Sequence, residues 1–145
     1  MKTSLVAGIR RVEQAAVDES NTIGFLGEAL RVYSTPSMVH DIEYACWRLI
    51  GEHLDPGEAS LGVHVSVDHM GATPIGHRVE IAVAVQSVDG RKVTLDAEVR
   101  DAAEVVGRGT HVRVVTEVDR LRPRVASKRE RLDAQSGSPG RGAAE

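Results

Sequence analysis

Apolar and polar residues alternate along most of the second half of the chain. The alternation runs through four stretches, which are residues 61–69, 79–85, 93–99 and 105–118. A period of two is that of a half-buried β-strand, so four strands are expected. In the first of them His69 is in phase with Val65 and Val67, which places its side chain on the apolar face. Asp68 is adjacent in sequence and points to the opposite face.

Turn signals separate these strands. Thr73-Pro74 lies within a turn from Gly71 to Gly76, and Asp89-Gly90 predicts a two-residue type I′ hairpin, which needs positive φ at both central residues. Connections this short make neighbouring strands antiparallel.

The first third of the chain predicts one more strand and a covering segment. Mixed apolar residues from Gly8 to Val17 favour a strand, which ends at the polar residues 18–21. Residues 22–34 contain two glycines among scattered apolar side chains, typical of a loop or short helix that could act as a lid.

A helical period follows between Thr35 and the sequence Asp55-Pro56-Gly57, which is expected to stop the helix. Thr35 is the expected N-cap and Pro36 the first helical residue. Seven apolar side chains fall on one face at 100° per residue: Met38, Val39, Ile42, Ala45, Cys46, Leu49 and Ile50. Glu43 lies at the margin of this face. Burying a charged carboxylate there without a partner costs several kcal/mol, so we expect a partner to face Glu43.

These elements define an α+β fold, a five-stranded antiparallel sheet wrapped around one long central helix. Residues 1–120 are expected to form this single domain. Residues 121–145 are a basic tail rich in Gly, Ser and Ala, with a short ordered stub and a disordered end.

Charge and composition exclude several partners. Residues 1–119 hold 11 Lys and Arg against 18 Asp and Glu, while residues 120–145 hold 7 against 3. An acidic body with 3% aromatic residues lacks the surface that nucleic acid needs. No apolar run approaches the roughly 20 residues of a membrane span, and no signal peptide is recognisable, so we expect a cytoplasmic protein that does not enter membranes. The single Cys46 forms no disulfide within the chain.

Several classes of enzyme chemistry are excluded because their sequence motifs are absent. Phosphate-binding loops, a GxSxG elbow and HExxH are absent, and the six histidines show no metal-ligand spacing, so no metal is expected. Four polar residues lie at apolar edges: Thr35, Glu43, His69 and Arg113. Each also has an ordinary structural explanation, as a helix cap, an ion pair, a core-edge histidine or a surface charge.

Five stretches, in order and with matching spacing, resemble the fluoroacetyl-CoA thioesterase family, a branch of the hotdog-fold thioesterases. They are Val32–Val39 with Glu43–Cys46, Leu54–Gly62, His69 with Ala72–Pro74, Val88–Arg91 and Gly107–Arg113. The resemblance implies a dimer that hydrolyses a small acyl-CoA thioester at sites on the subunit interface. Coenzyme A enters as part of the substrate, and no other cofactor is implied.

The resemblance also assigns roles. Thr35, Glu43 and His69 match the family's catalytic set, and Gly62 and Arg113 match residues that shape the site. Two positions differ from the fluoroacetyl-specific pattern. Pro36 stands where the family has glycine, and the lid has Phe25 and no second aromatic residue before Tyr33.

A thioester needs a nucleophile, a base and charge stabilisation, and its thiol leaves readily because its pKa is about 8.5. Glu43 is expected to attack the carbonyl or activate water, Thr35 to orient the reacting groups, and His69 to transfer protons. The free N–H groups of Ser37 and Met38 at the helix N-terminus could hold the oxyanion.

Two alternatives stay open. The chain could be a hotdog dehydratase of 3-hydroxyacyl thioesters, although Asp68 and His69 point to opposite faces. It could also bind acyl-CoA without turnover. The basic tail could contact CoA phosphates or simply be a solvated end.

Overall fold

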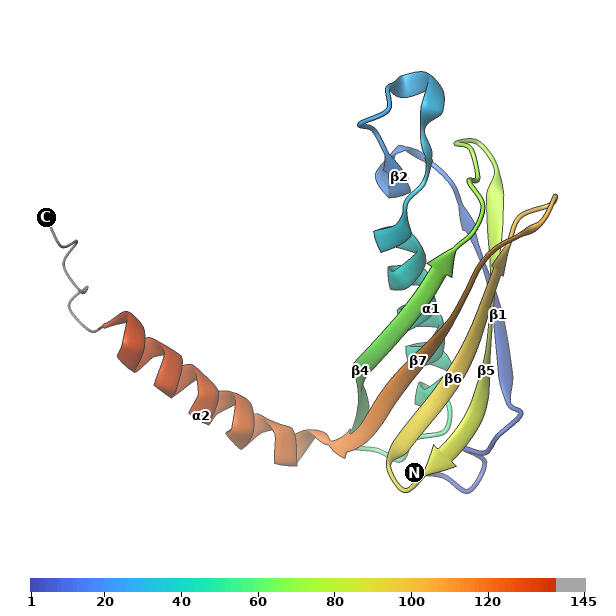
Figure 1. Ribbon diagram of the computed structural model, residues 1–145. Helices are drawn as coiled ribbons and strands as arrows, with labels where there is room; N and C mark the ends of the chain where they lie inside the picture. Colours follow the sequence, from blue (N-terminus) through green and yellow to red (C-terminus); the bar gives the residue numbers. More distant parts are fainter. Residues whose placement is uncertain (138–145) are drawn as a thin grey trace, which may run out of the picture.

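A five-stranded antiparallel sheet with one long helix against one face is the framework of the computed structural model, which describes residues 1–137 (Figure 1). The five strands and the helix are β1 (Arg10–Ala16), β4 (Glu58–His69), β5 (Arg78–Asp89), β6 (Lys92–Arg100), β7 (Val105–Glu117) and α1 (Thr35–Gly51). Their order across the sheet is β1-β5-β6-β7-β4, so β1 and β4 are the two edges. The predicted fold is confirmed.

The lid, defined here as residues 18–34, consists of short elements at one end of the molecule. Two 3₁₀ turns, η1 (Glu19–Asn21) and η2 (Glu28–Leu30), alternate with the paired strands β2 (Thr22–Ile23) and β3 (Val32–Tyr33). A bridge from Val32 to Pro74 ties the lid to the turn between β4 and β5. The lid therefore stands beyond the C-terminal end of β4 (Figure 1).

The helix buries six of the seven residues in the apolar stripe that its sequence predicts, and the seventh, Val39, is half-buried. The buried residues of α1 are Met38, Ile42, Ala45, Cys46, Leu49 and Ile50. They pack on the inward-facing residues of β5 and β6, and each large aliphatic side chain contributes roughly 1.5–3 kcal/mol. The first turn of the helix approaches the sheet closely, because a Cβ on Gly107 would lie 2.4 Å from the sulfur of Met38.

The ends of α1 differ from the prediction. Ser34, not Thr35, is the N-cap: its backbone is extended, with φ −83° and ψ 150°, and its side chain accepts a hydrogen bond from the Ser37 N–H. Thr35 is already helical, and Pro36 follows inside the first turn. The helix stops at Gly51 with Glu52 as C-cap, before the Asp55-Pro56-Gly57 sequence.

A β-bulge changes which residues of β4 face the helix. The pairing of β4 with β7 shifts between Gly62 and His64, leaving Val63 as the extra residue. An extra residue reverses the alternation. Gly62 therefore faces inward before the bulge, and Val65 and His69 face inward after it. The single unbroken phase predicted from Leu61 to His69 is wrong for its first part.

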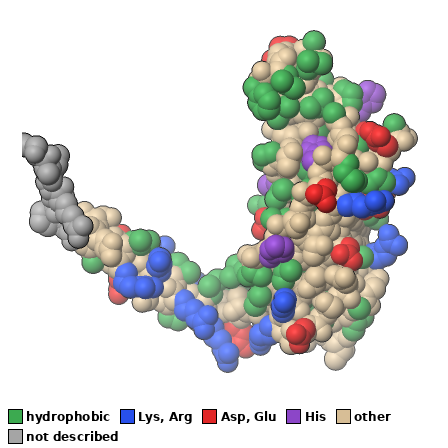
Figure 2. Space-filling view, in the orientation of Figure 1, with side chains coloured by type: hydrophobic (Ala, Val, Ile, Leu, Met, Phe, Trp, Pro, Cys, Tyr) green, Lys and Arg blue, Asp and Glu red, His purple; other side chains and the backbone are tan. Residues whose placement is uncertain are grey.

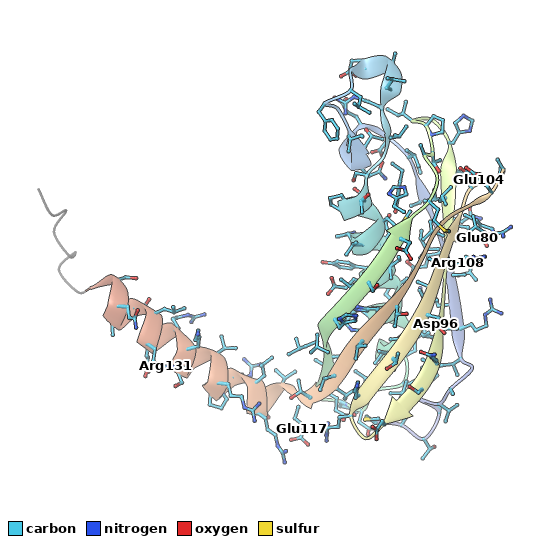
Figure 3. All side chains as sticks on the ribbon, viewed as in Figure 1. Glu80, Asp96, Glu104, Arg108, Glu117 and Arg131 are labelled. Atoms are coloured by element: carbon cyan, nitrogen blue, oxygen red, sulfur yellow. The ribbon has the colours of Figure 1, made fainter. Side chains whose placement is uncertain are left out.

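The opposite face of the sheet is polar and carries charged side chains. Figure 3 shows Glu80, Asp96 and Arg108 projecting from this face, away from α1. The hairpin between β5 and β6 is a two-residue turn at Gly90-Arg91, in which Gly90 has φ +59° and Arg91 has a negative φ. Positive φ at the first central residue alone is typical of type II′, so the predicted type I′ turn is wrong.

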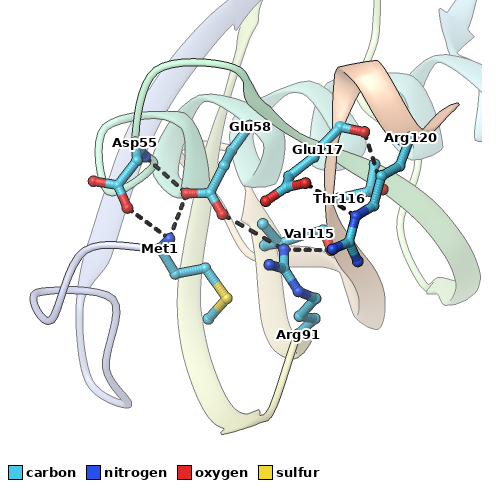
Figure 4. Close-up of polar contacts among 8 residues, drawn as sticks. All are labelled: Met1, Asp55, Glu58, Arg91, Val115, Thr116, Glu117 and Arg120. Carbon is cyan, nitrogen blue, oxygen red and sulfur yellow. Dashed lines mark hydrogen bonds and ion pairs between the residues drawn. The ribbon is translucent and has the colours of Figure 1, made fainter. Parts of the chain in front are cut away.

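The end of the molecule opposite the lid is held by a small ionic cluster (Figure 4). The Met1 amine contacts Asp55, 2.9 Å away, and Glu58, and Glu58 also accepts a hydrogen bond from the Asp55 N–H. Arg91 adds an ion pair at 3.5 Å. These contacts tie the start of β4 to the N-terminus and to the turn between β5 and β6.

The basic tail forms more structure than the short stub predicted. Helix α2 (Val118–Ser136) continues directly from β7 and extends past the β4 edge into solvent, with no buried residue (Figure 1). Pro123 lies inside α2 and cannot donate the backbone hydrogen bond of its turn. The predicted disordered end, residues 138–145, lies outside the described part of the chain.

Candidate active site

A threonine and a histidine meet at the first turn of α1. The Thr35 hydroxyl and His69 Nδ1 are 2.8 Å apart, within hydrogen-bond distance. Since Ser34 caps the helix, the Thr35 hydroxyl is free for this contact. Both residues line a hollow of about 520 Å³ together with lid residues, among them Phe25 and Tyr33. The pair that the sequence proposed is therefore in contact.

Tyr33 supports this histidine from behind. Its ring meets the His69 ring edge-on, with centroids 6.2 Å apart, and its hydroxyl donates a hydrogen bond to Asp41. Burial, and then the bond to Asp41, raises the pKa of Tyr33, so the phenol stays protonated and remains a donor. Tyr33 and Asp41 were not singled out from the sequence, since neither breaks an apolar pattern.

Glu43 has the partner that its position requires. Arg113 Nη1 lies 3.4 Å from Glu43 Oε1, and the Glu43 side chain is 45% exposed while that of Arg113 is only 5% exposed. Arg113 is therefore a buried cation whose charge reaches the carboxylate, and not the surface charge that its strand position also allowed. Glu43, Arg113 and the exposed aromatic residues Tyr44 and Trp47 line a second hollow, of about 390 Å³.

Arg113 is held by a set of buried groups. It donates from Nε to Ser60 Oγ at 2.8 Å and from Nη2 to the Ser60 carbonyl at 2.7 Å. Nη1 also donates to His111 Nε2 at 3.1 Å, which leaves His111 Nδ1 to donate to the His64 carbonyl at 2.8 Å. Burial, reinforced by Arg113, lowers the pKa of His111, so it serves as a neutral acceptor.

His111 is thus a supporting residue that the sequence reading missed. Its signal was available, because His111 and Arg113 are two apart in a strand and so share a face.

Gly62 completes this second group. A Cβ at this position would lie 3.0 Å from Glu43 Oε1, 3.1 Å from His111 Cε1 and 3.3 Å from Arg113 Nη1. Glycine leaves the space in which the carboxylate sits. The predicted association of Gly62 with the site is consistent with this position.

The two groups lie apart within one chain. Thr35 and Glu43 are eight residues apart in α1, which corresponds to about 12 Å along the helix axis. They line separate hollows, with His69 beside Thr35 and Arg113 beside Glu43. The three proposed catalytic residues therefore do not converge within one chain but lie in two separate groups.

The donors at the helix N-terminus also differ from those expected. The Ser37 N–H donates to Ser34 Oγ at 3.1 Å and the Met38 N–H to the Ser34 carbonyl at 3.0 Å. These N–H groups are therefore not free for an oxyanion, and the Met38 side chain is fully buried. Within residues 1–137 the Thr35 N–H has no hydrogen-bond partner, and Thr35 lines the same hollow as His69.

Within the same residues, no group of three or more His, Cys, Asp or Glu side chains is arranged to hold a metal ion. Neither helix that the structure describes combines the length and the apolar character of a membrane span. Cys46 is buried, and burial raises its pKa to about 12, so it is not a nucleophile at neutral pH.

Comparisons with known proteins agree on one class. The chain matches the family model described as fluoroacetyl-CoA-specific thioesterase over residues 17–119. It is 32% identical to the fluoroacetyl-CoA thioesterase of Streptantibioticus cattleyicolor over 135 residues, covering 88% of this chain and 97% of that protein.

Two solved structures extend the likeness. A variant of the fluoroacetyl-CoA-specific thioesterase in complex with fluoroacetate and CoA superposes with a TM-score of 0.72 at 32% identity, covering 79% of this chain and 98% of that one. A hot-dog-like protein from Thermanaerovibrio acidaminovorans superposes with a TM-score of 0.79 at 27% identity, covering 84% of this chain and 91% of that one.

A sheet wrapped around a central helix, with a Thr–His pair at the helix start and a Glu two turns later, defines a hotdog-fold thioesterase. The chain belongs to the fluoroacetyl-CoA-specific thioesterase family. The resemblance, fold and enzyme class predicted from the sequence are confirmed.

Proposed function

We propose that this protein hydrolyses a short acyl-CoA thioester to the free acid and CoA, acting as a dimer whose two sites are shared between protomers. The observation that carries the proposal is the Thr35–His69 contact, which lies beside an unpartnered N–H in a hollow under the lid. Membership of the family supports the substrate class, and its crystallised relative was bound to fluoroacetate and CoA.

The dimer is supported by the edge strand β4. Among the described residues 1–137 its outer edge has no partner strand, and its apolar residues Leu61, Val63 and Val65 are 43%, 59% and 40% exposed. Tyr44 and Trp47 of α1 are similarly exposed on the same side as Glu43. Contiguous exposed apolar surface along an open strand edge is typical of an interface.

Pairing two copies through β4 accounts for the separation of the Thr35–His69 pair from Glu43 and Arg113 within one chain. A two-fold axis perpendicular to the sheet makes the two β4 strands antiparallel and keeps both α1 helices on one side. Gly62 and Glu43 of one protomer then approach the end of the partner's β4, where the partner's His69 lies. Each site takes Thr35 and His69 from one chain and Glu43 with Arg113 from the other.

The chemistry follows from these positions. Glu43, held by Arg113, either attacks the acyl carbon itself or removes a proton from the water that attacks it. The oxygen that becomes negative is stabilised by the Thr35 N–H, whose contribution is about 2.7–4 kcal/mol by analogy with other oxyanion donors. Collapse of the tetrahedral intermediate breaks the C–S bond, and His69, oriented by Thr35 and Tyr33, supplies the proton to the CoA thiolate. Where water attacks, this releases the free acid directly; where Glu43 attacks, a water molecule then hydrolyses the Glu43 acyl anhydride, which releases the acid and restores the carboxylate.

No group besides the acyl-CoA is needed for these steps. We also propose a cytoplasmic location, since a reducing compartment keeps the released CoA thiol free.

The test is the release of thiol from a panel of short and aryl acyl-CoA esters, fluoroacetyl-CoA included. Glu43→Gln and His69→Ala should each lower kcat by about tenfold or more while circular dichroism shows an intact fold. Unchanged rates in both variants would remove these residues from the mechanism. Thermal stabilisation by acyl-CoA with no thiol release from any ester would instead indicate a binding protein.

A further inference from the structure

We propose that helix α2 is an exchanged arm that packs on the lid of the partner protomer and helps to close its acyl site. This inference rests on the proposed dimer. It concerns an element that the reaction described above does not use.

The starting point is the direction of α2. Glu117, the last residue of β7, pairs with Glu58, the first residue of β4, so α2 begins at the end of the molecule opposite the lid. From there it extends beyond the β4 edge, away from its own sheet (Figure 1). The space beyond that edge is where a partner joined through β4 would lie.

Antiparallel pairing determines which part of the partner α2 meets. The start of one β4 strand lies beside the end of the other, and the partner's β4 ends at His69, next to its lid. With 19 residues α2 is about 28 Å long, which is enough to cross the lid. The arm cannot reach the lid of its own chain, because the two stand at opposite ends of the protomer (Figure 1).

The two surfaces are chemically complementary. Val118, Leu121, Val125 and Leu132 fall within about 60° of one another at 100° per residue, forming a narrow apolar stripe on α2. Val125 is 47% and Leu132 54% exposed. The lid carries its own exposed apolar patch, which consists of Phe25, Leu26 and Leu30 at 81%, 55% and 58% exposure. Figure 2 shows apolar side chains gathered over the lid end.

The charges agree with this pairing. Arg124, Lys128, Arg129 and Arg131 of α2 form no ion pair within the described chain, and Arg131 points into solvent in Figure 3. The lid has three acidic residues, Asp18, Glu19 and Glu28, against the single cation Arg31. A basic arm therefore meets an acidic lid, and burial of the apolar stripe would stabilise the contact.

Cross-linking between subunits tests the contact directly. Two differently tagged chains, one Val125→Cys and one Leu26→Cys, are co-expressed and treated with a short bis-maleimide. Buried Cys46 contributes little background. We expect a covalent dimer containing both tags. Val125→Cys paired with Val12→Cys is the matched control, because Val12 is 54% exposed on the opposite edge strand β1.

Kinetics test the consequence. Val125→Asp should raise the KM for acyl-CoA by about fivefold with little change in kcat, because the lid loses its support while the reacting groups are untouched. Ala126→Asp, on another face of the same helix, should leave the KM unchanged.

An absent cross-link in a protein that is dimeric by sedimentation would overturn the arm and leave the shared site standing. A monomeric protein would overturn both. A cross-linked dimer without thioesterase activity would confirm the arm and refute the proposed reaction.

Discussion

At the scale of single residues, the site depends on space as much as on functional groups. Gly62→Ala should lower kcat/KM by about tenfold, because its methyl group would press on Glu43 Oε1, His111 and Arg113 at 3.0–3.3 Å and displace the carboxylate. Since Gly62 has no positive φ, the backbone itself tolerates alanine. Steady-state thiol release, compared with the thermal midpoint, measures the effect. Gly51→Ala, with open space around it, is the control, and equal loss in both variants would contradict the role of Gly62.

Individual site residues could be predicted from the sequence where a polar residue interrupts an apolar pattern. Glu43 at the margin of an apolar stripe called for a partner, and Arg113 is that partner. Tyr33 and Asp41 could not be found in the same way, because an aromatic residue before a helix and an acid on its solvent side are ordinary. Only the fold brings Tyr33 edge-on to His69.

At the scale of elements, the start of α1 places the residue that caps the helix next to the proposed catalytic threonine. Ser34→Ala should lower the free energy of unfolding by about 1 kcal/mol, since it removes the cap on the Ser37 N–H. Thr35→Val should change stability by less than about 0.5 kcal/mol but lower kcat roughly tenfold, since it removes the hydroxyl that contacts His69. Urea denaturation and thiol release distinguish the two. The reverse pattern would restore Thr35 as the cap.

Strand β4 shows where the sequence period no longer predicts which face a residue lies on. The apolar stripe of α1 and the five strands follow directly from periods of 3.6 and 2. The bulge at Val63 does not, because an inserted residue in a strand looks like any other valine. Its consequence is that Gly62 joins the group around Glu43, which a single phase from Leu61 to His69 would have placed on the outer face.

At the scale of the whole molecule, acid should loosen the end opposite the lid. The hydrogen bond from the Met1 amine, then that from the Asp55 N–H and the charge of Arg91, lower the pKa of Glu58 below its usual 4.5. A carboxyl with a lowered folded pKa stabilises the fold fully above pH 4.5, and that stability is lost as the pH falls. Glu58→Gln should therefore lose less free energy of unfolding than the parent between pH 6 and pH 3.5.

Denaturant titrations at the two pH values measure this difference. Glu117→Gln is the matched control, since that carboxylate lies at the same end of the molecule and is 47% exposed. An equal acid response in the parent and Glu58→Gln would show that the cluster does not contribute. The acid dependence could not be anticipated from composition, because it requires Met1 and Glu58, 57 residues apart, to meet.

In the proposed dimer each active site takes residues from both chains, and mixing experiments can test this sharing. His69→Ala and Glu43→Gln proteins should each be nearly inactive alone. In a heterodimer, one site combines intact His69 and Thr35 from the Glu43→Gln chain with intact Glu43 from the other, while the second site carries both defects. Random reassortment makes half of the dimers mixed, so about a quarter of the parent activity should return. If Glu43 and His69 acted within one protomer, no mixture of the two variants would recover activity.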